Sequence, residues 1–159
     1  MTNTFEAPDR AQWLRLWSAL PAAPVKALAA DLASQHRVED LALPQSGLGL
    51  LPLSDSALGD TYFIGEIPLA QAHVRVTTTQ GQLIEGAAIL VDDRAGVARS
   101  MAILDAVLVA RLPGCEAALQ LLNQGAATVA EQSRQRRALL AATRVDFALL
   151  GTNEEDDDE

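Results

Sequence analysis

Residues that could carry chemistry are few in this sequence, and two of them stand on one predicted strand. His73 and Arg75 lie two positions apart in the run Gln71–Thr77, where polar and apolar residues alternate, so they share the polar face of a strand. Two neighbouring cationic side chains can hold a phosphate or a carboxylate, and an arginine does so through two parallel hydrogen bonds. A solvated strand face, or one that contacts a partner, has the same pattern, so both interpretations stay open.

Two carboxylates stand among apolar neighbours, where an ionised group is costly unless it is paired. Glu66 lies inside the otherwise apolar run Phe63–Leu69. We expect it to be exposed at a sheet edge, paired with an arginine such as Arg75, or presented to a partner. Asp105 has only apolar residues three and four positions away along its predicted helix, so it needs a hydrogen-bonding partner. That partner is a backbone amide or an arginine within the fold, or else Asp105 contacts another chain.

Motifs of known catalytic machinery are missing from the sequence. It has no GxxxxGK[ST] phosphate loop, no HExxH and no GxSxG. The two histidines, His36 and His73, fall in different contexts, a helix end and a strand, so they predict no metal site. The single cysteine, Cys115, excludes an internal disulfide and an iron–sulfur or zinc site built from the chain's own thiolates, and we expect a packed thiol. We therefore expect no metal and no cofactor on this chain, and the sequence assigns no catalytic residue.

The composition is that of a folded domain with an acidic end. The chain has 159 residues, of which 49% are hydrophobic, and a net charge of −9, with an uninterrupted acidic run at positions 154–159. We expect a single α+β domain over residues 1–151 and a disordered acidic tail over residues 152–159. No basic stripe points to nucleic acid. No apolar run approaches the ~20 residues of a membrane span, and no leader is recognisable, so we expect a cytoplasmic protein.

A helical hairpin is predicted at the N-terminal end. Asp9 has the spacing of a helix N-cap, and an apolar stripe follows until Pro21 ends the helix. Pro24 is suited to the first position of a second helix, which runs to about Gln35.

About four mainly antiparallel strands are predicted next. They are Gly47–Leu53, Tyr62–Leu69, Gln71–Thr77 and Leu83–Val91. Pro68 favours a sheet edge or a bulge, and the last strand is so apolar that we expect both its faces to be covered.

Helices are predicted again at the C-terminal end. Asp93 is the expected N-cap of a helix that ends at Pro113–Gly114. A further helical region runs from Cys115 to about Leu140, with a break expected near Gly125, and Val145–Leu150 stays unassigned. The order of elements indicates an α+β fold: an N-terminal helical hairpin, a sheet, then C-terminal helices.

Several short motifs occur in an order that resembles a known family. They are Arg10–Gln12–Trp13, Gly65–Glu66, Val74–Arg75, Gly86, Ala98…Ala102…Asp105–Ala106 and Val145–Asp146–Phe147. Over residues 9–151 the chain is similar to PhnG, the G subunit of the bacterial carbon–phosphorus lyase system. Two places depart from the family pattern. The family tends to carry Thr–Arg at Ala70–Gln71 and Gly–Arg–Asp at Asp92–Asp93–Arg94.

The resemblance implies a role in using phosphonates as a phosphorus source. In the family, the G subunit works with the H, I and L subunits. Together they transfer ribose triphosphate from ATP to methylphosphonate and release adenine. ATP and methylphosphonate are thus substrates of the complex, alpha-D-ribose 1-methylphosphonate 5-triphosphate synthase. The I subunit can attack the nucleoside bond by itself, and G belongs to a core with H, I and J, in two copies.

Three classes of function remain open. The first is a transferase subunit that is non-catalytic by itself and acts by docking, with Glu66, His73 and Arg75 reaching a neighbour's site or its rim and Asp105 as a weaker interface candidate. The second is a small autonomous enzyme acting on nucleotides. The third is a stand-alone interaction or scaffold protein. A large apolar fraction without a self-contained active site favours the first, because obligate interfaces resemble opened cores.

Overall fold

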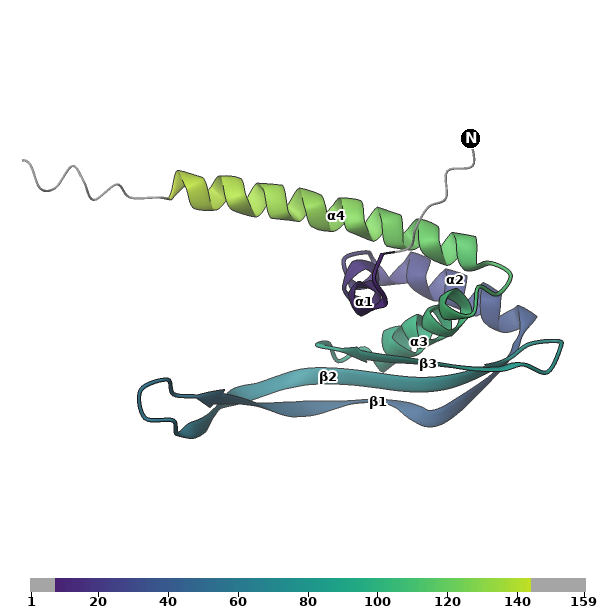
Figure 1. The fold of residues 1–159 in the computed structure, drawn as a ribbon, viewed down its shortest axis with the longest axis horizontal. Coiled ribbons are helices and arrows are strands. Elements are labelled where there is room, and N and C mark those ends of the chain that lie inside the picture. Colours follow the sequence, from purple (N-terminus) through teal and green to yellow (C-terminus); the bar gives the residue numbers. More distant parts are fainter. Residues whose placement is uncertain (1–7, 144–159) are drawn as a thin grey trace, which may run out of the picture.

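The computed structural model describes residues 8–143 and shows four helices and a three-stranded antiparallel sheet (Figure 1). In chain order the elements are α1 (Arg10–Ser18), α2 (Ala22–Gln35), β1 (Arg37–Ser54), β2 (Thr61–Thr77), β3 (Leu83–Leu90), α3 (Ala95–Val109) and α4 (Cys115–Ala142). The predicted α+β class is confirmed, with a helical hairpin before the sheet and helices after it. The segment 145–150, which the sequence left unassigned, and the expected acidic tail at 152–159 lie outside the described residues, and the single domain stays a prediction.

The helices cover one face of the sheet, and α3 lies directly on that face (Figure 1). Every second residue of β3 is buried under the helices, as are alternate residues at the C-terminal end of β2. Helix α3 is buried on nearly all sides because the other helices cover its far side. The largest fully buried side chains come from all these layers: Trp17, Leu32, Val74, Met101, Leu104 and Leu122.

The strand order is β1-β2-β3, and the strands differ greatly in length. Strand β3 pairs only with the part of β2 from Ala70 to Thr77. Strands β1 and β2 continue past that point as a two-stranded ribbon joined by a loop, which extends beyond the end of β3 (Figure 1). We call residues 47–69 of this ribbon the arm.

The prediction of about four strands was too high by one. The predicted strands Tyr62–Leu69 and Gln71–Thr77 form one continuous strand, β2, and Gly47–Leu53 is the end of a longer strand, β1. Pro68 does not interrupt β2, because β3 ends before it reaches this residue and β2 is an edge strand at that point. At a sheet edge, the N–H group that proline lacks is not needed for pairing with a further strand. The expectation that Leu83–Val91 is covered on both faces was wrong within the described residues. Helices cover one face, and the other is open.

Three helix details differ from the sequence predictions. Arg94, not Asp93, is the N-cap residue of α3, and α2 begins at Ala22, so Pro24 lies within its first turn. Helix α4 runs unbroken through Gly125. A Cβ at Gly125 would overlap the backbone carbonyl of Leu16, so this glycine allows close contact between α4 and α1 instead of a helix break. The predicted cap at Asp9 is confirmed, because its carboxylate accepts the Ala11 amide at 3.2 Å.

Candidate functional site

Asp105 of α3 lies where α1 meets the free edge of β3. Its Oδ1 accepts a hydrogen bond from Arg10 Nε at 2.9 Å, and its Oδ2 accepts bonds from Arg10 Nη2 at 2.7 Å and from the Ala87 backbone N–H at 3.2 Å. The side chain of Asp105 is 7% exposed and that of Arg10 is 56% exposed. The hydrogen bond to Asp105 raises the pKa of Arg10 above its ordinary value. Asp105 therefore has both partners that the sequence allowed, an amide and an arginine, and its bonds connect three elements.

Close packing of α3 on β3 brings the Asp105 carboxylate to the strand edge. A Cβ at Gly86 would overlap the carbonyl oxygen of Ala102 and lie 2.7 Å from the amide nitrogen of Ala106, so only glycine allows this approach. Asp105 then accepts the amide of Ala87 and satisfies one donor of an edge strand. These contacts give Asp105 a structural role within the chain.

His73 and Arg75 lie together on the outer face of the sheet, opposite the helices, as predicted. Arg75 Nη2 donates to Glu85 Oε1 at 2.9 Å, and its Nη1 lies 4.0 Å from Glu39 Oε2. His73 Nε2 lies 3.1 Å from Glu85 Oε2. Arg75 faces Glu39 and Glu85 directly on the two neighbouring strands, the arrangement in which opposite charges stabilise a sheet. We call these four residues the sheet cluster.

Glu85 already occupies the place between the two cationic groups. The hydrogen bond from Arg75, and a weaker one from His73, lower the pKa of Glu85 below its ordinary value. Its carboxylate therefore takes the position from which an incoming phosphate or carboxylate would contact both His73 and Arg75. Glu85 was not among the site residues predicted from the sequence, although its place on an apolar strand was a signal.

A hollow of about 220 Å³ opens beside the sheet cluster. Its wall on β1 is irregular, because the register of β1 against β2 shifts between Asp40 and Ala42 and again between Ala42 and Gln45. The lining is mostly apolar and consists of Ala42, Leu43, Gln71, Ala72, His73, Ala87 and Ile89. Apart from His73, the lining side chains include no acid, base or nucleophile, so the hollow has no second group for a reaction.

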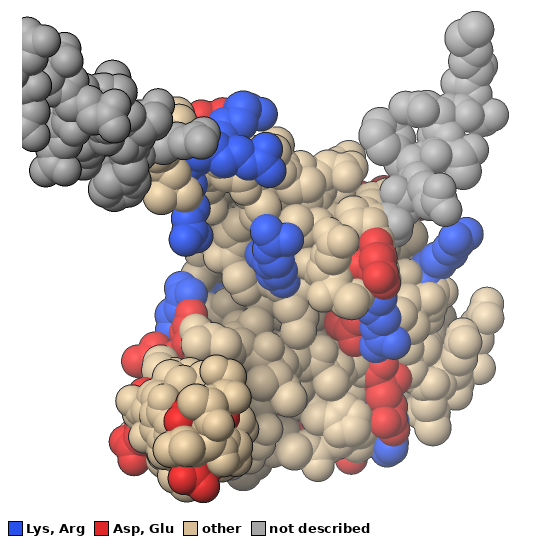
Figure 2. Space-filling model, turned by 60° about the vertical axis from the view of Figure 1, so that its left-hand side comes forward, with Lys and Arg blue, Asp and Glu red and all other residues tan. Residues whose placement is uncertain are grey.

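Glu66 lies on the arm, exposed and opposite Leu50 of β1. Among the described residues it forms no ion pair, so it is not joined to Arg75. An exposed place at a sheet edge is one of the three possibilities that the sequence left open for Glu66. The arm carries two further carboxylates, Asp55 and Asp60, and no Lys, Arg or His. Figure 2 shows the end of the arm as a mostly uncharged surface with acidic side chains.

Large apolar side chains are exposed along the whole arm. Leu50 and Leu51 are neighbours on β1, so they point to opposite faces of the ribbon, and they are 58% and 40% exposed. Six more are between 45% and 77% exposed: Leu48, Leu53, Leu58, Tyr62, Phe63 and Ile64. On the outer face of β3, Ile89 is exposed near the arm, whereas Leu83 is exposed at the other end of the strand, beyond the sheet cluster. So many exposed large apolar side chains on one short ribbon are typical of a protein–protein contact.

Other candidate chemistry is weak in the described part of the chain. Burial and the neighbouring Glu116 raise the pKa of the Cys115 thiol, so it stays protonated, and it packs against the core as expected. Residues 8–143 contain no group of three His, Cys, Asp or Glu side chains placed to hold a metal ion. None of the four described helices is both long enough and apolar enough to cross a membrane.

The two departures from the family pattern have different surroundings. Ala70 is fully buried beneath the helices, whereas Gln71 is exposed beside the hollow. Asp92 and Arg94 form a local ion pair in the turn between β3 and α3, and the bond from Arg94 lowers the pKa of Asp92. That turn therefore stabilises itself without a ligand.

Comparisons with known proteins agree with this order of elements and motifs. The family described as phosphonate metabolism protein PhnG matches residues 8–151, which is nearly the whole chain. A comparison with curated proteins returns no match. The matched span contains every described helix and strand, the arm, the sheet cluster and Asp105. The chain therefore belongs to the PhnG family of phosphonate metabolism proteins.

Proposed function

We propose that this chain is a docking subunit of the complex that activates phosphonates. That complex transfers ribose triphosphate from ATP to methylphosphonate and releases adenine. The family resemblance implies that this chain is the G subunit of the complex. In this proposal the chain performs no chemistry alone. The single observation that carries the proposal is the arm, a ribbon with apolar side chains exposed on both faces.

Exposure of the arm is costly in water. An isolated two-stranded ribbon is at best marginally stable, and burial of a large apolar side chain contributes about 1.5–3 kcal/mol. The eight large apolar side chains of the arm are roughly half exposed. Covering them would contribute on the order of 8 kcal/mol before the costs of association. A gain of that size supports a stable interface with another chain.

The charges of the arm indicate the chemistry of the surface that covers it. Asp55, Asp60 and Glu66 are its only charged residues, and all are acidic. A partner surface that fits would therefore be an apolar groove with basic residues at its rim. The H, I, J and L subunits are the candidate partners that the family implies. The sheet cluster lies on the same sheet as the arm, so His73 and Arg75 could reach the rim of a partner's site.

Co-expression with the I subunit tests this proposal. The arm variant carries Leu50→Ser and Phe63→Ser, which remove side chains that are 58% and 63% exposed. The matched control carries Leu139→Ser and Leu140→Ser on α4, where the side chains are 67% and 59% exposed. We expect the arm variant to bind at least tenfold more weakly, as expected for central apolar contacts, and the control to bind within threefold of the parent. Equal binding by the two variants would contradict docking through the arm.

An activity measurement separates docking from the two alternatives. The isolated chain, incubated with ATP and methylphosphonate, should release no adenine, whereas the assembled complex should release it. Turnover by the isolated chain would favour a small autonomous enzyme. Failure to bind any subunit of the phosphonate system, with the chain otherwise folded, would favour an independent interaction or scaffold protein.

A further inference from the structure

A second hollow, of about 370 Å³, lies between the end of α1 and the outer half of α4. Helix α4 touches α1 closely at Gly125, and one turn later Val129 still packs partly against the core. Arg136 follows Val129 by seven residues, so the two share one face of α4. Arg15 and Ser18 face them from α1, three residues apart.

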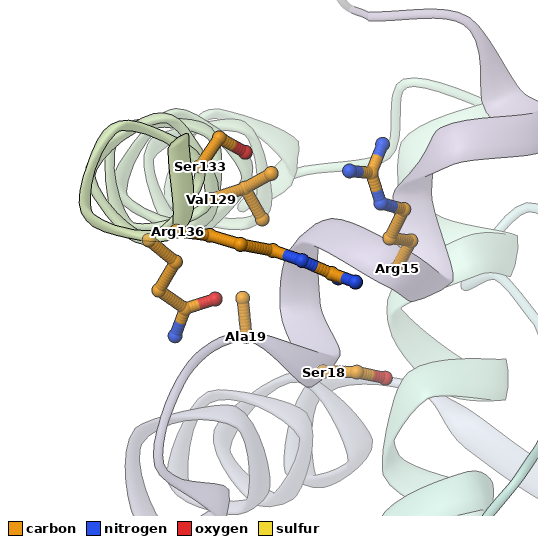
Figure 3. Close-up of a pocket in the computed structure, with 7 residues that line it drawn as sticks. Arg15, Ser18, Ala19, Val129, Ser133 and Arg136 are labelled. Atoms are coloured by element: carbon orange, nitrogen blue, oxygen red, sulfur yellow. The ribbon is translucent and has the colours of Figure 1, made fainter. Parts of the chain in front are cut away.

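Two guanidinium groups converge on this hollow. Arg136 extends from α4 across the hollow towards α1, and Arg15 rises from α1 beside it (Figure 3). The lining also includes Ser18, Ser133 and the amide of Gln132, but no carboxylate. The hollow therefore has hydrogen-bond donors from both helices and an excess of positive charge.

Arg15 and Arg136 have no carboxylate partner among the described residues, as is also true of Arg37, Arg111 and Arg137, but these two line one hollow together. Within residues 8–143, five arginines each pair with an Asp or Glu: Arg10, Arg75, Arg94, Arg99 and Arg134. Arg15 and Arg136 form no such pair with any described residue, although like charges brought together repel each other. Figure 2 shows Lys and Arg side chains gathered around the exposed end of α4, where this hollow lies.

We propose that this hollow binds the dianionic tetrahedral group of a phosphate or phosphonate. Two guanidinium groups can each donate two parallel hydrogen bonds to such a group, and the hydroxyls of Ser18 and Ser133 line the same space. A phosphoryl group has three terminal oxygens and a charge near −2, which matches two cations and several donors. A carboxylate has two oxygens and a single charge, so it satisfies half of this site.

The hollow is open to water, so the affinity is modest. Arg15 and Arg136 are both exposed, and exposed charges are screened by salt. A dissociation constant on the order of 1 mM, about −4 kcal/mol, is expected at low ionic strength. The arm does not line the hollow, so this site does not depend on the proposed docking function.

The test is a titration of the purified full-length chain at pH 8 and low ionic strength. Inorganic phosphate, methylphosphonate and tripolyphosphate are the probes, acetate is the carboxylate comparison, and calorimetry gives the dissociation constants, with ³¹P line broadening as a second measurement for the phosphorus probes. Arg15→Gln and Arg136→Gln each remove one proposed ligand. Arg134→Gln is the matched control, because it removes the same charge from the same helix but belongs to an ion pair with Glu131.

We expect saturable binding of the phosphoryl probes, at least tenfold weaker in both Arg15→Gln and Arg136→Gln and within twofold of the parent in Arg134→Gln. Acetate, with one carboxylate and a single charge, should bind at least tenfold more weakly than phosphate. Three results would overturn the proposal: no saturable binding to the parent, an equal loss in Arg134→Gln, or equal affinity for acetate. Circular dichroism confirms that each variant is folded. Ser133→Ala, a milder change in the lining, should weaken phosphate binding about threefold without removing charge, and unchanged binding would exclude its hydroxyl as a donor.

Discussion

Replacement of Asp105 by alanine should destabilise the fold, because one carboxylate holds α1, α3 and β3 together. Its hydrogen bonds to Arg10 are charge-assisted, a class worth about 1.5–3 kcal/mol when desolvated. Arg10 is more than half exposed, so solvent reduces that contribution to about 1 kcal/mol. Loss of the acceptor for the Ala87 amide adds about 1–2 kcal/mol. We therefore expect Asp105→Ala to lower the free energy of unfolding by about 2–3 kcal/mol.

Urea unfolding of the full-length chain measures this loss. Trp13 and Trp17 are buried on α1, next to the Asp105 contact, so their fluorescence reports on the affected part of the fold. With a typical slope for a small domain, the midpoint should fall by about 1 M urea. Asp93→Asn is the control, because Asp93 is exposed, and it should change the free energy of unfolding by less than about 0.5 kcal/mol.

A double-mutant cycle with Arg10→Ala isolates the ion pair. Arg10 and Asp105 should show a coupling of about 1 kcal/mol, because each single substitution removes the same pair of hydrogen bonds. A coupling below about 0.3 kcal/mol, or an Asp105→Ala variant as stable as the parent, would refute the structural role of Asp105. In that case the contact with another chain, which the sequence left open for Asp105, would become the better interpretation.

Two further perturbations follow from the same contacts. Gly86→Ala should cost about 2–3 kcal/mol or prevent folding, because its Cβ would overlap backbone atoms of α3. Gly65→Ala, on the arm with open space around it, should cost less than about 1 kcal/mol in the same urea assay, and equal costs would contradict the close approach of α3 to β3. Glu85→Gln should make the free energy of unfolding depend less on pH in the acid range. Because Arg75 and His73 lower the pKa of Glu85, its contribution is present above its ordinary pKa of 4.5 and is lost as the pH falls through the lowered value. Unfolding measured at several pH values should show the full difference between parent and variant at pH 7 and a smaller one as the pH falls below 4.5, and a difference that grows as the pH falls would contradict this assignment.

Local patterns in the sequence were enough to predict the class of the fold. The cap at Asp9 and the apolar stripe after it predicted α1, and alternation in Gln71–Thr77 predicted which residues of that strand face the helices. The joining of two predicted strands into β2 was not predictable from Pro68 alone. Whether proline interrupts a strand depends on where the neighbouring strand ends. The pairing of β3 with β2 ends at Ala70, so it stops before Pro68.

The partners of the candidate site residues were harder to predict than the residues themselves. The apolar neighbours of Asp105 showed that it needs a partner, but Arg10 is 95 positions away, and only the packing of α1 on α3 brings the two together. Glu85 escaped selection because its role depends on the register of β3 against β2. The sequence also could not show that the apolar residues of the arm lie outside the core, because a run of leucines looks the same whether its own fold or another chain covers it.

The central claim, that the arm is covered by another chain, is tested most directly by amide hydrogen exchange. The exchange of residues 47–69 is compared between the chain alone and the assembled phosphonate complex, with β3 and α3 as internal references. The account predicts that exchange in the arm slows at least tenfold on assembly, while the buried helix α3 changes little. Equal exchange of the arm in the free chain and in the complex would contradict the claim.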